Sequence, residues 1–308
     1  MLVYHYTSIE TLEKILSATS KENPVVMLRA THSNFLNDGT ENTLGCMILP
    51  KCIRQIEEDL NVAEKDRISF LFEDLRFIQY AVDHQKMFDD HAEVLHSNFV
   101  ISFSKDADSL VMWSMYGNKG DGVALGFETD ELEPVKDSQD DILMNYFKEE
   151  CLYWSDEDIK KTQLDKSSKL YVSIKELYSS MADPIVQSSM RKLYESEGTG
   201  ERVEMALKEN LALNLISFCS IFHKLGMWQN EKEYRVSWGE FVKIKYRKSA
   251  SGVYVPYIDA PYPLSALKEI VIGPKCGRNA YGMVRSLFHS KGLFQGIPLI
   301  KESHCPLQ

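Results

Sequence analysis

Polar and aromatic residues that could bind a ligand or carry out catalysis are concentrated in three separated blocks of the chain. The blocks lie at residues 5–7, 102–116 and 231–233. Imidazole, hydroxyl and carboxylate groups orient ligands by hydrogen bonding, transfer protons and stabilise developing charge. Such chemistry requires that the fold bring all three blocks to one place.

The first block is the sequence His5-Tyr6-Thr7, inside a run of β-branched and aromatic residues that predicts a strand over 2–7. A histidine in this position can orient a bound hydroxyl through its ring nitrogens. Tyr6 and Thr7 add hydroxyl groups beside it. The alternative is a core histidine that hydrogen-bonds a backbone carbonyl.

The second block combines hydroxyl groups with aromatic rings. Ser102 and Ser104 are two apart on an expected strand, so both side chains project from one face. Trp113 and Tyr116 are three apart on the expected helix that follows, so they share one helix face. Hydroxyls beside aromatic rings suit a flat polar ligand ring such as a nicotinamide or a base. The alternative is an aromatic stripe that packs into the core.

The third block places two carboxylates where a loop enters a strand. Glu231 and Glu233 point the same way if the strand has already begun at the first of them. One acid could then hold a ribose hydroxyl while the other stabilises positive charge. Arg235 could instead pair with either acid, and a solvated strand edge is a further alternative.

A dense polar loop follows the second expected strand. It contains Arg29, Asn34, Asn37, Asp38 and Glu41. A capped turn would explain these residues. If nearby acids joined Asp38 and Glu41, the loop could also hold Mg²⁺ in a metal-dependent hydrolase or nuclease.

The elements that must position these groups alternate irregularly along the chain. Hydrophobic periodicity predicts strands at 2–7, 25–30, 98–104, 122–129, 233–238, 253–258 and 269–274. It predicts helices at 9–18, 40–59, 62–96, 109–117, 211–222 and 280–293. Residues 130–210 are charge-rich and have helical spacing, which indicates a helical insertion. The long, unequal connections favour a split or two-sheet α+β core over a doubly wound sheet.

The composition is that of a globular protein, with 44% hydrophobic and 26% charged residues. The net charge of -10 disfavours broad non-specific binding to nucleic acid, although a local basic site remains compatible with it. The six cysteines show neither a CxxC pair nor zinc-ligand spacing, which predicts buried, reduced thiols. We expect a cytoplasmic protein, since the sequence suggests neither a signal peptide nor a membrane span.

The order of the motifs carries more information than any one of them. HYTSIETLEKIL, LRAT with NFLND, FVISFSKD with MWSMYG and GVALGFE, and finally EKEYRV follow one another along the chain. In combination they resemble the bacterial family catalogued as domain of unknown function 2971. The resemblance extends from residue 4 to about residue 275, and 130–210 contributes no motif to it. That family in turn resembles a divergent ADP-ribosyltransferase fold.

The resemblance implies a single α+β domain over 1–308 with a split two-sheet ADP-ribosyltransferase-like core. Helical segments at about 40–96 and 130–222 would lie within that domain. The implied activity is that of an NAD-dependent ADP-ribosyltransferase or NAD glycohydrolase, with NAD as substrate and a protein or nucleic acid as target. The implied setting is bacterial conflict or phage defence, as a toxin or antiviral effector.

The resemblance also assigns roles to the three blocks. Glu233 is the favoured catalytic acid and Glu231 its rival, while seven residues would bind NAD: His5, Tyr6, Thr7, Ser102, Ser104, Trp113 and Tyr116. The main alternative is a non-catalytic nucleotide-sensing or protein-interaction module on the same fold. In that case 130–210 would be the natural surface for a partner protein.

Overall fold

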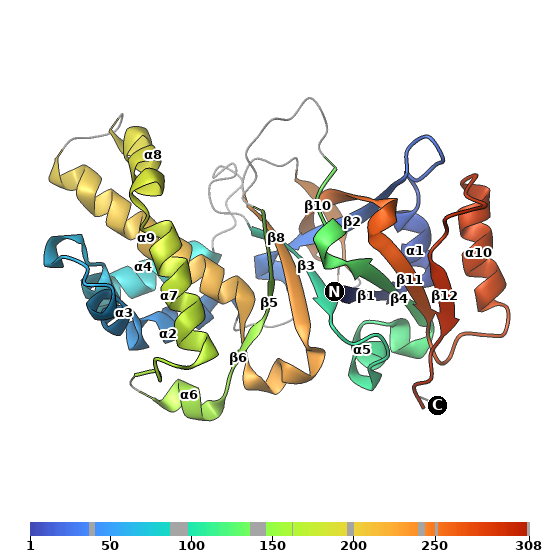
Figure 1. The fold of residues 1–308 in the computed structure, drawn as a ribbon, viewed down its shortest axis with the longest axis horizontal. Helices are drawn as coiled ribbons and strands as arrows, with labels where there is room; N and C mark the ends of the chain where they lie inside the picture. Colours follow the sequence, from blue (N-terminus) through green and yellow to red (C-terminus); the bar gives the residue numbers. More distant parts are fainter. Residues whose placement is uncertain are drawn as a thin grey trace. The chain divides into compact units, whose positions relative to one another are not determined.

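The computed structural model describes residues 1–36, 41–86, 98–135, 146–161, 163–195, 200–239, 244–249 and 252–306. The chain forms two compact units, each assembled from separate stretches (Figure 1). The sheet unit comprises Met1–Phe35, Val94–Cys151 and Trp228–Gln308. The helical unit comprises Leu36–Glu93 and Leu152–Met227. All three chemical blocks fall within the sheet unit.

The sheet unit is built on a ten-stranded, mostly antiparallel sheet. Its main strand order is β12-β11-β4-β1-β3-β2-β10-β9, while β8 pairs with β3 and β5 pairs with β8. Only β11 and β12 pair in parallel among these strands. The strands are β1 (Leu2–Ser8), β2 (Val25–His32), β3 (Asn98–Ser104), β4 (Gly122–Glu128), β5 (Tyr146–Glu150), β8 (Glu233–Gly239), β9 (Lys245–Lys248), β10 (Tyr254–Pro263), β11 (Leu267–Ile272) and β12 (Leu299–Glu302).

Strand β3, which carries Ser102 and Ser104, pairs with the strands that carry His5 and Glu233. β8 pairs along the whole length of one edge of β3, from Asn98 to Ser104. On the opposite edge, β1 pairs at Ser104, whereas β2 pairs at Val100 and Phe99. β1 and β2 therefore share one edge of β3 and meet it at opposite ends, with the middle of β3 between them.

Side-chain alternation gives the sheet two different faces. Val3 joins the larger hydrophobic core, into which α1 (Ile9–Ile15) and α10 (Ala280–Ser290) pack. Tyr4 and Tyr6 point to the other face, where α5 (Leu110–Met115) covers them with Trp113. Ser8 caps α1 by accepting a hydrogen bond from the Thr11 backbone N–H at 3.1 Å.

The helical unit packs its helices around α9. Its helices are α2 (Glu41–Ile48), α3 (Ile53–Asp59), α4 (Leu75–Lys86), α6 (Asp156–Lys160), α7 (Lys169–Met181), α8 (Pro184–Tyr194) and α9 (Glu201–Phe222). Strands β6 (Leu152–Trp154) and β7 (His223–Leu225) form a small parallel sheet. Helix α2 approaches α9 closely at Gly45, where an added Cβ would lie 2.3 Å from the Ile216 carbonyl oxygen. Only glycine fits this approach without a backbone shift.

Helix α9 is long and apolar enough to span a membrane by length and composition alone, and about half of its most apolar stretch is buried within the protein. The buried residues include Leu211, Leu215, Ile216 and Cys219, which join the core of the helical unit. These contacts are those of a core helix.

The predicted α+β class is confirmed, as are the seven predicted strands and the helices after Ser8, after Ser109 and near residue 280. The prediction that 130–210 is a mostly helical insertion outside the sheet was wrong in part, because β5 and β6 lie within it and β5 pairs with β8 in the large sheet. In β5, exposed Phe147 and Glu149 alternate with half-buried neighbours. Because most of its residues are charged, the strand lacks the alternation of apolar and polar residues by which a strand is predicted. The expected helix at 40–59 is interrupted at Pro50, in a 3₁₀ turn over Leu49–Lys51. Part of the expected helix at 62–96 lies outside the described residues.

Candidate functional site

The strand register brings the three blocks onto adjacent strands of one sheet. Ser104 lies opposite Tyr4 of β1 on one side and opposite Glu233 of β8 on the other. Ser102 lies opposite Arg235 of β8. Since residues directly opposite one another project from the same face, Ser102, Ser104, Glu233 and Arg235 share the face that carries Tyr4.

His5 projects from the other face of the sheet, because it follows Tyr4 in β1. Its ring meets the Phe103 ring edge-on, with centroids 5.8 Å apart. Its Nδ1 lies 3.1 Å from the Ser102 carbonyl oxygen, so this nitrogen carries the proton and donates it. Burial lowers the pKa of His5 despite the opposing effect of this hydrogen bond. The ring is therefore neutral near pH 7, and Nε2 presents a lone pair that can accept a hydrogen bond.

Ser104 is fully buried, and its hydroxyl group both donates and accepts a hydrogen bond. The hydroxyl donates to the Glu231 carbonyl oxygen at 2.7 Å and accepts from the Asp106 backbone N–H at 3.1 Å. These bonds hold together the end of β3 and the segment that leads into β8. Ser102, by contrast, is partly exposed.

Glu231 precedes strand β8 and ends a 3₁₀ segment over Gly226–Glu231. Its carboxylate is buried and accepts a hydrogen bond from the Tyr116 hydroxyl at 2.7 Å. The residue that follows, Lys232, has φ of 45°, in the left-handed region that non-glycine residues rarely adopt. This turn means that Glu231 and Glu233 are not successive side chains on one strand face.

Glu233 is the first residue of β8 and forms a buried ion pair with Arg235. The Arg235 Nε donates to Glu233 Oε1 at 2.8 Å, and both side chains are at most 5% exposed. The Cys151 thiol lies 3.8 Å from the other carboxylate oxygen. Of the sequence alternatives for Arg235, pairing with an acid is therefore the one found, and the acid is Glu233.

The aromatic residues of the site are mostly enclosed. Trp113 has no exposed surface; its indole N–H donates to Asp108 at 2.6 Å, and its ring packs against Tyr6. A ligand ring could stack on Trp113 only if α5 moved. Tyr116 is partly exposed, and its hydroxyl is held by Glu231.

Tyr6 and Thr7 of the first block have structural contacts. The Tyr6 hydroxyl donates to the Asp106 carbonyl oxygen at 2.8 Å and accepts from the Ser109 backbone N–H at 3.1 Å. Thr7 is buried and lies opposite Val123 of β4. Both residues join β1 to its neighbours.

Sequence reasoning missed two residues that shape this region. Cys151 lies in the segment without recognisable motifs, so nothing in the sequence linked it to Glu233. Asp108 accepts hydrogen bonds from Trp113, the Ser303 hydroxyl and the His304 backbone N–H. Burial by itself would raise the pKa of Asp108, but these hydrogen bonds outweigh it and hold the pKa below its usual value.

The polar loop after β2 is described only in part. The Arg29 guanidinium lies 4.7 Å from the centre of the Tyr257 ring and 3.9 Å from Asp259. Asn37, Asp38 and the side chain of Glu41 lie outside the described residues. Across the parts of the chain that are described, no group of three or more His, Cys, Asp or Glu residues could hold a metal ion. The six cysteines are free, four of them buried and two partly exposed.

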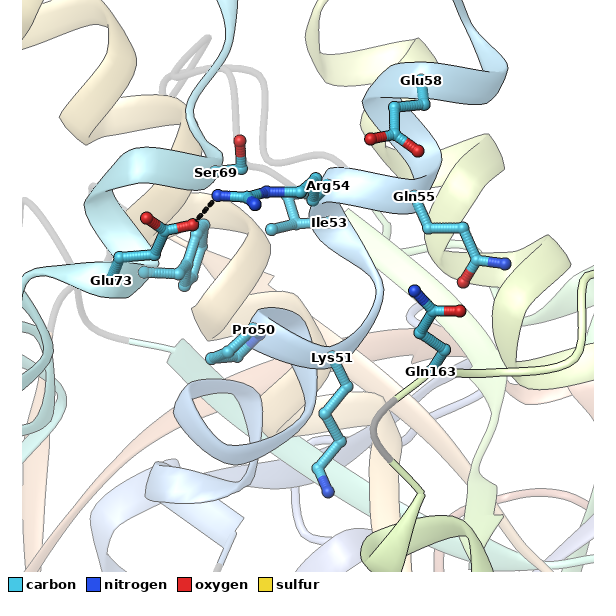
Figure 2. Close-up of a pocket in the computed structure, with 10 residues that line it drawn as sticks. Pro50, Lys51, Ile53, Arg54, Gln55, Glu58, Ser69, Glu73 and Gln163 are labelled. Atoms are coloured by element: carbon cyan, nitrogen blue, oxygen red, sulfur yellow. Dashed lines mark hydrogen bonds and ion pairs between the residues drawn. The ribbon is translucent and has the colours of Figure 1, made fainter.

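A pocket of about 260 Å³ lies in the helical unit, and none of its lining residues is a predicted site residue. Figure 2 shows Arg54 paired with Glu73 on one side and the amides of Gln55 and Gln163 turned toward one another on the other. The Gln55 amide nitrogen donates to the Leu164 carbonyl oxygen at 3.3 Å. The pocket is lined by Pro50, Lys51, Ile53, Arg54, Gln55, Glu58, Ser69, Phe72, Glu73 and Gln163.

Comparison with known families gives one match. Residues 112–236 match the family described as protein of unknown function (DUF2971), which confirms the predicted family resemblance over that segment. The matched segment covers less than half of the chain. It contains Trp113, Tyr116, Glu231 and Glu233, and it leaves His5 and the two serines of β3 outside. No curated protein and no solved structure matches the chain.

Proposed function

We propose that this chain is an NAD-dependent ADP-ribosyltransferase or an NAD glycohydrolase that uses the β1–β3–β8 region. The observation that carries the proposal is the neutral imidazole of His5, fixed by the Ser102 carbonyl where β1 leaves the edge of β3. Its Nε2 can accept a hydrogen bond from a ribose hydroxyl. The ADP-ribosyltransferase-like arrangement of the core is part of the proposal.

The proposed reaction breaks the bond between nicotinamide and the ribose of NAD. The bonding electron pair leaves with nicotinamide, and the ribose passes through a state with oxocarbenium character. Glu233 stabilises this positive charge, with Glu231 as the alternative acid. A nucleophile on the acceptor then bonds to the ribose carbon and loses its proton. When water is the nucleophile, the products are ADP-ribose, nicotinamide and a proton.

A second candidate is a non-catalytic module that binds a nucleotide or a partner protein. It is favoured by the buried and hydrogen-bonded state of Ser104, Glu231 and Glu233. Groups held this way are common in structural networks. His5 also projects from the opposite face of the sheet to Ser104 and Glu233. Catalysis that combines the imidazole with either enclosed acid would therefore require local opening at β8, whereas binding at the partly exposed His5 would not.

The test is incubation of the protein with NAD labelled in the adenylate moiety, with and without cell lysate. The variants are Glu233→Gln, Glu231→Gln and His5→Gln. Glu269→Gln is the matched control, because Glu269 is also buried in this sheet and accepts from the Tyr4 hydroxyl at 2.8 Å. We expect label on a macromolecule, or free ADP-ribose, with wild type and the control.

Each variant should lower turnover at least about tenfold, the usual scale for loss of one transition-state contact. Binding of NAD without turnover by wild type would instead support the non-catalytic module. If wild type neither binds nor consumes NAD, the proposal fails. Equal losses in Glu269→Gln and Glu233→Gln would show that the loss reflects folding.

The proposed setting is the bacterial cytoplasm, where NAD is available, with a role in conflict between bacteria and phages. This setting rests on the sequence resemblance. Labelled products from a lysate identify the acceptor as protein or nucleic acid through their sensitivity to protease or nuclease.

A further inference from the structure

A short segment after β12 crosses from the edge of the large sheet to helix α5, and both belong to the sheet unit. β12 ends at Glu302, and the Ser303 backbone N–H still donates to the Ile272 carbonyl oxygen of β11 at 2.9 Å. The chain then meets Asp108, which lies just before α5 begins. Residues 303–305 are here called the strap.

The Asp108 carboxylate accepts hydrogen bonds from two sides. From the strap, the His304 backbone N–H donates to Oδ2 at 2.7 Å and the Ser303 hydroxyl donates to Oδ1. From α5, the Trp113 indole N–H donates to Oδ1 at 2.6 Å. All three groups are donors here, so a carboxylate can satisfy them, whereas an amide would turn its own N–H groups against at least one of them. The carboxylate therefore ties the strap to α5.

Helix α5 depends on contacts of this kind because it is short. It has six residues, and Leu110 and Met115 are 51% and 50% exposed. A helix of this length is not stable by itself in water. On the sheet side, the Tyr6 ring packs edge-on against Trp113, with centroids 4.7 Å apart, and the Tyr6 hydroxyl accepts from the Ser109 backbone N–H. Tertiary contacts therefore decide whether α5 stays in place.

The same helix encloses groups of the region proposed to act on NAD. Trp113 has no exposed surface, and Glu231 is 3% exposed. Tyr116, the residue after α5, donates its hydroxyl proton to the Glu231 carboxylate at 2.7 Å. Outward movement of α5 would carry Trp113 and Tyr116 with it and break this hydrogen bond. The closed position of α5 therefore keeps a ligand away from the indole ring and from the carboxylate.

We propose that the strap holds α5 closed through Asp108 and so inhibits the proposed NAD site. None of the three strap residues is buried, so the strap can detach while the core of the sheet stays intact. Trp113 then loses the partner of its indole N–H, α5 opens, and Glu231 becomes accessible to a ribose hydroxyl. The inhibition rests on the proposed function, whereas the closure of α5 does not.

The first measurement is hydrogen exchange of peptides covering residues 109–117 in the full chain, without NAD. The test variants are Asp108→Asn and Ser303→Ala. The matched control is His304→Ala, which removes an exposed side chain from the strap and keeps the backbone N–H that donates to Asp108. Asp108→Asn should speed exchange of these peptides at least about tenfold, the scale for losing a hydrogen bond to a charged group. Ser303→Ala should have a smaller effect in the same direction, and the control none.

The second measurement is NAD turnover by the same proteins. If a site works only in its open state, its apparent affinity is reduced by the fraction of molecules that are open. Asp108→Asn should therefore raise kcat/KM for NAD at least about tenfold over wild type, in step with the faster exchange. A merely structural role for Asp108 would lower turnover or leave it unchanged, so an increase distinguishes the two roles.

The closure of α5 by the strap is overturned if Asp108→Asn leaves exchange of residues 109–117 unchanged, or if His304→Ala speeds it equally. Faster exchange across β3 and β4 as well would also overturn it, since the strap would then support the whole sheet. If α5 opens and NAD turnover stays at the wild-type rate, the inhibition is wrong and the proposed function stands. If neither wild type nor the opened variant consumes NAD, the proposed function and the inhibition fail together, and the exchange result still decides whether the strap closes α5.

Discussion

The buried ion pair between Glu233 and Arg235 leads us to a prediction about the free energy of unfolding. Arg235 is among the largest fully buried side chains, with its Nε 2.8 Å from the Glu233 carboxylate. At that distance the attraction is about 6 kcal/mol for an effective dielectric constant of 20. Desolvation of both ions offsets much of this gain, so the pair adds little over an apolar replacement. Removing one partner, however, leaves a buried charge without its counter-ion.

We therefore expect Arg235→Met to lower the free energy of unfolding of the sheet unit by about 3–5 kcal/mol at pH 7. Arg29→Met is the matched control, because it makes the same chemical change on the same sheet at a side chain that is 46% exposed. It should cost less than about 1 kcal/mol. The double variant Glu233→Gln with Arg235→Met should be more stable than the sum of the single effects predicts, by about 2 kcal/mol.

The assay must report on the sheet unit alone, because a protein with two compact units need not unfold in one step. Hydrogen exchange of peptides that cover β3 and β8, measured against urea concentration, gives that local free energy. A cost for Arg235→Met within about 1 kcal/mol of the control would refute the reasoning. So would perfectly additive effects in the double variant.

Two further predictions concern a helix cap and a buried histidine. Ser8→Ala should lower the melting temperature by removing the cap of α1, at a cost of about 1 kcal/mol, whereas Ser114→Ala, at an exposed position in α5, should cost less. Burial lowers the pKa of His32 to about 4, and its Nδ1 accepts from the Asn34 backbone N–H, so the folded state keeps the ring neutral. The folded pKa of His32 lies below the unfolded value of 6.5. The neutral ring therefore contributes about 3 kcal/mol to the free energy of unfolding above about pH 6.5, and this contribution is lost as the pH falls toward 4. His32→Gln should flatten this part of the stability–pH curve; equal curves for wild type and His32→Gln would contradict the assignment.

The sequence predicted most elements of the sheet unit because their patterns are local. The strand around Ser102 alternates apolar and polar residues, and the helix after Ser8 has a capping residue at its start. Local patterns also identified Arg235 as a possible partner of the acids. They could not select the acid, since that depends on side-chain packing across β8.

Three features of the site depend on information that the sequence does not carry locally. The pairing of Ser104 with Glu233 is set by a register between strands more than a hundred residues apart. The left-handed backbone at Lys232 separates the two acids, and lysine gives no signal for such a turn. His5 follows Tyr4 on the opposite pleat, so its separation from the carboxylate face became clear only once the register was known.

The interleaving of the two units along the chain has a consequence for synthesis on the ribosome. The helical unit is complete once residue 227 has emerged, whereas the sheet unit still lacks β8, β9, β10, β11 and β12. Until then β3 has no β8 along one edge, and β2 has no β10. The early strands therefore leave the exit tunnel long before their partners and stay open to wrong pairing during elongation. Chaperone demand during translation should fall on these amino-terminal strands, and a pause in elongation shortly before residue 228 would prolong their exposure.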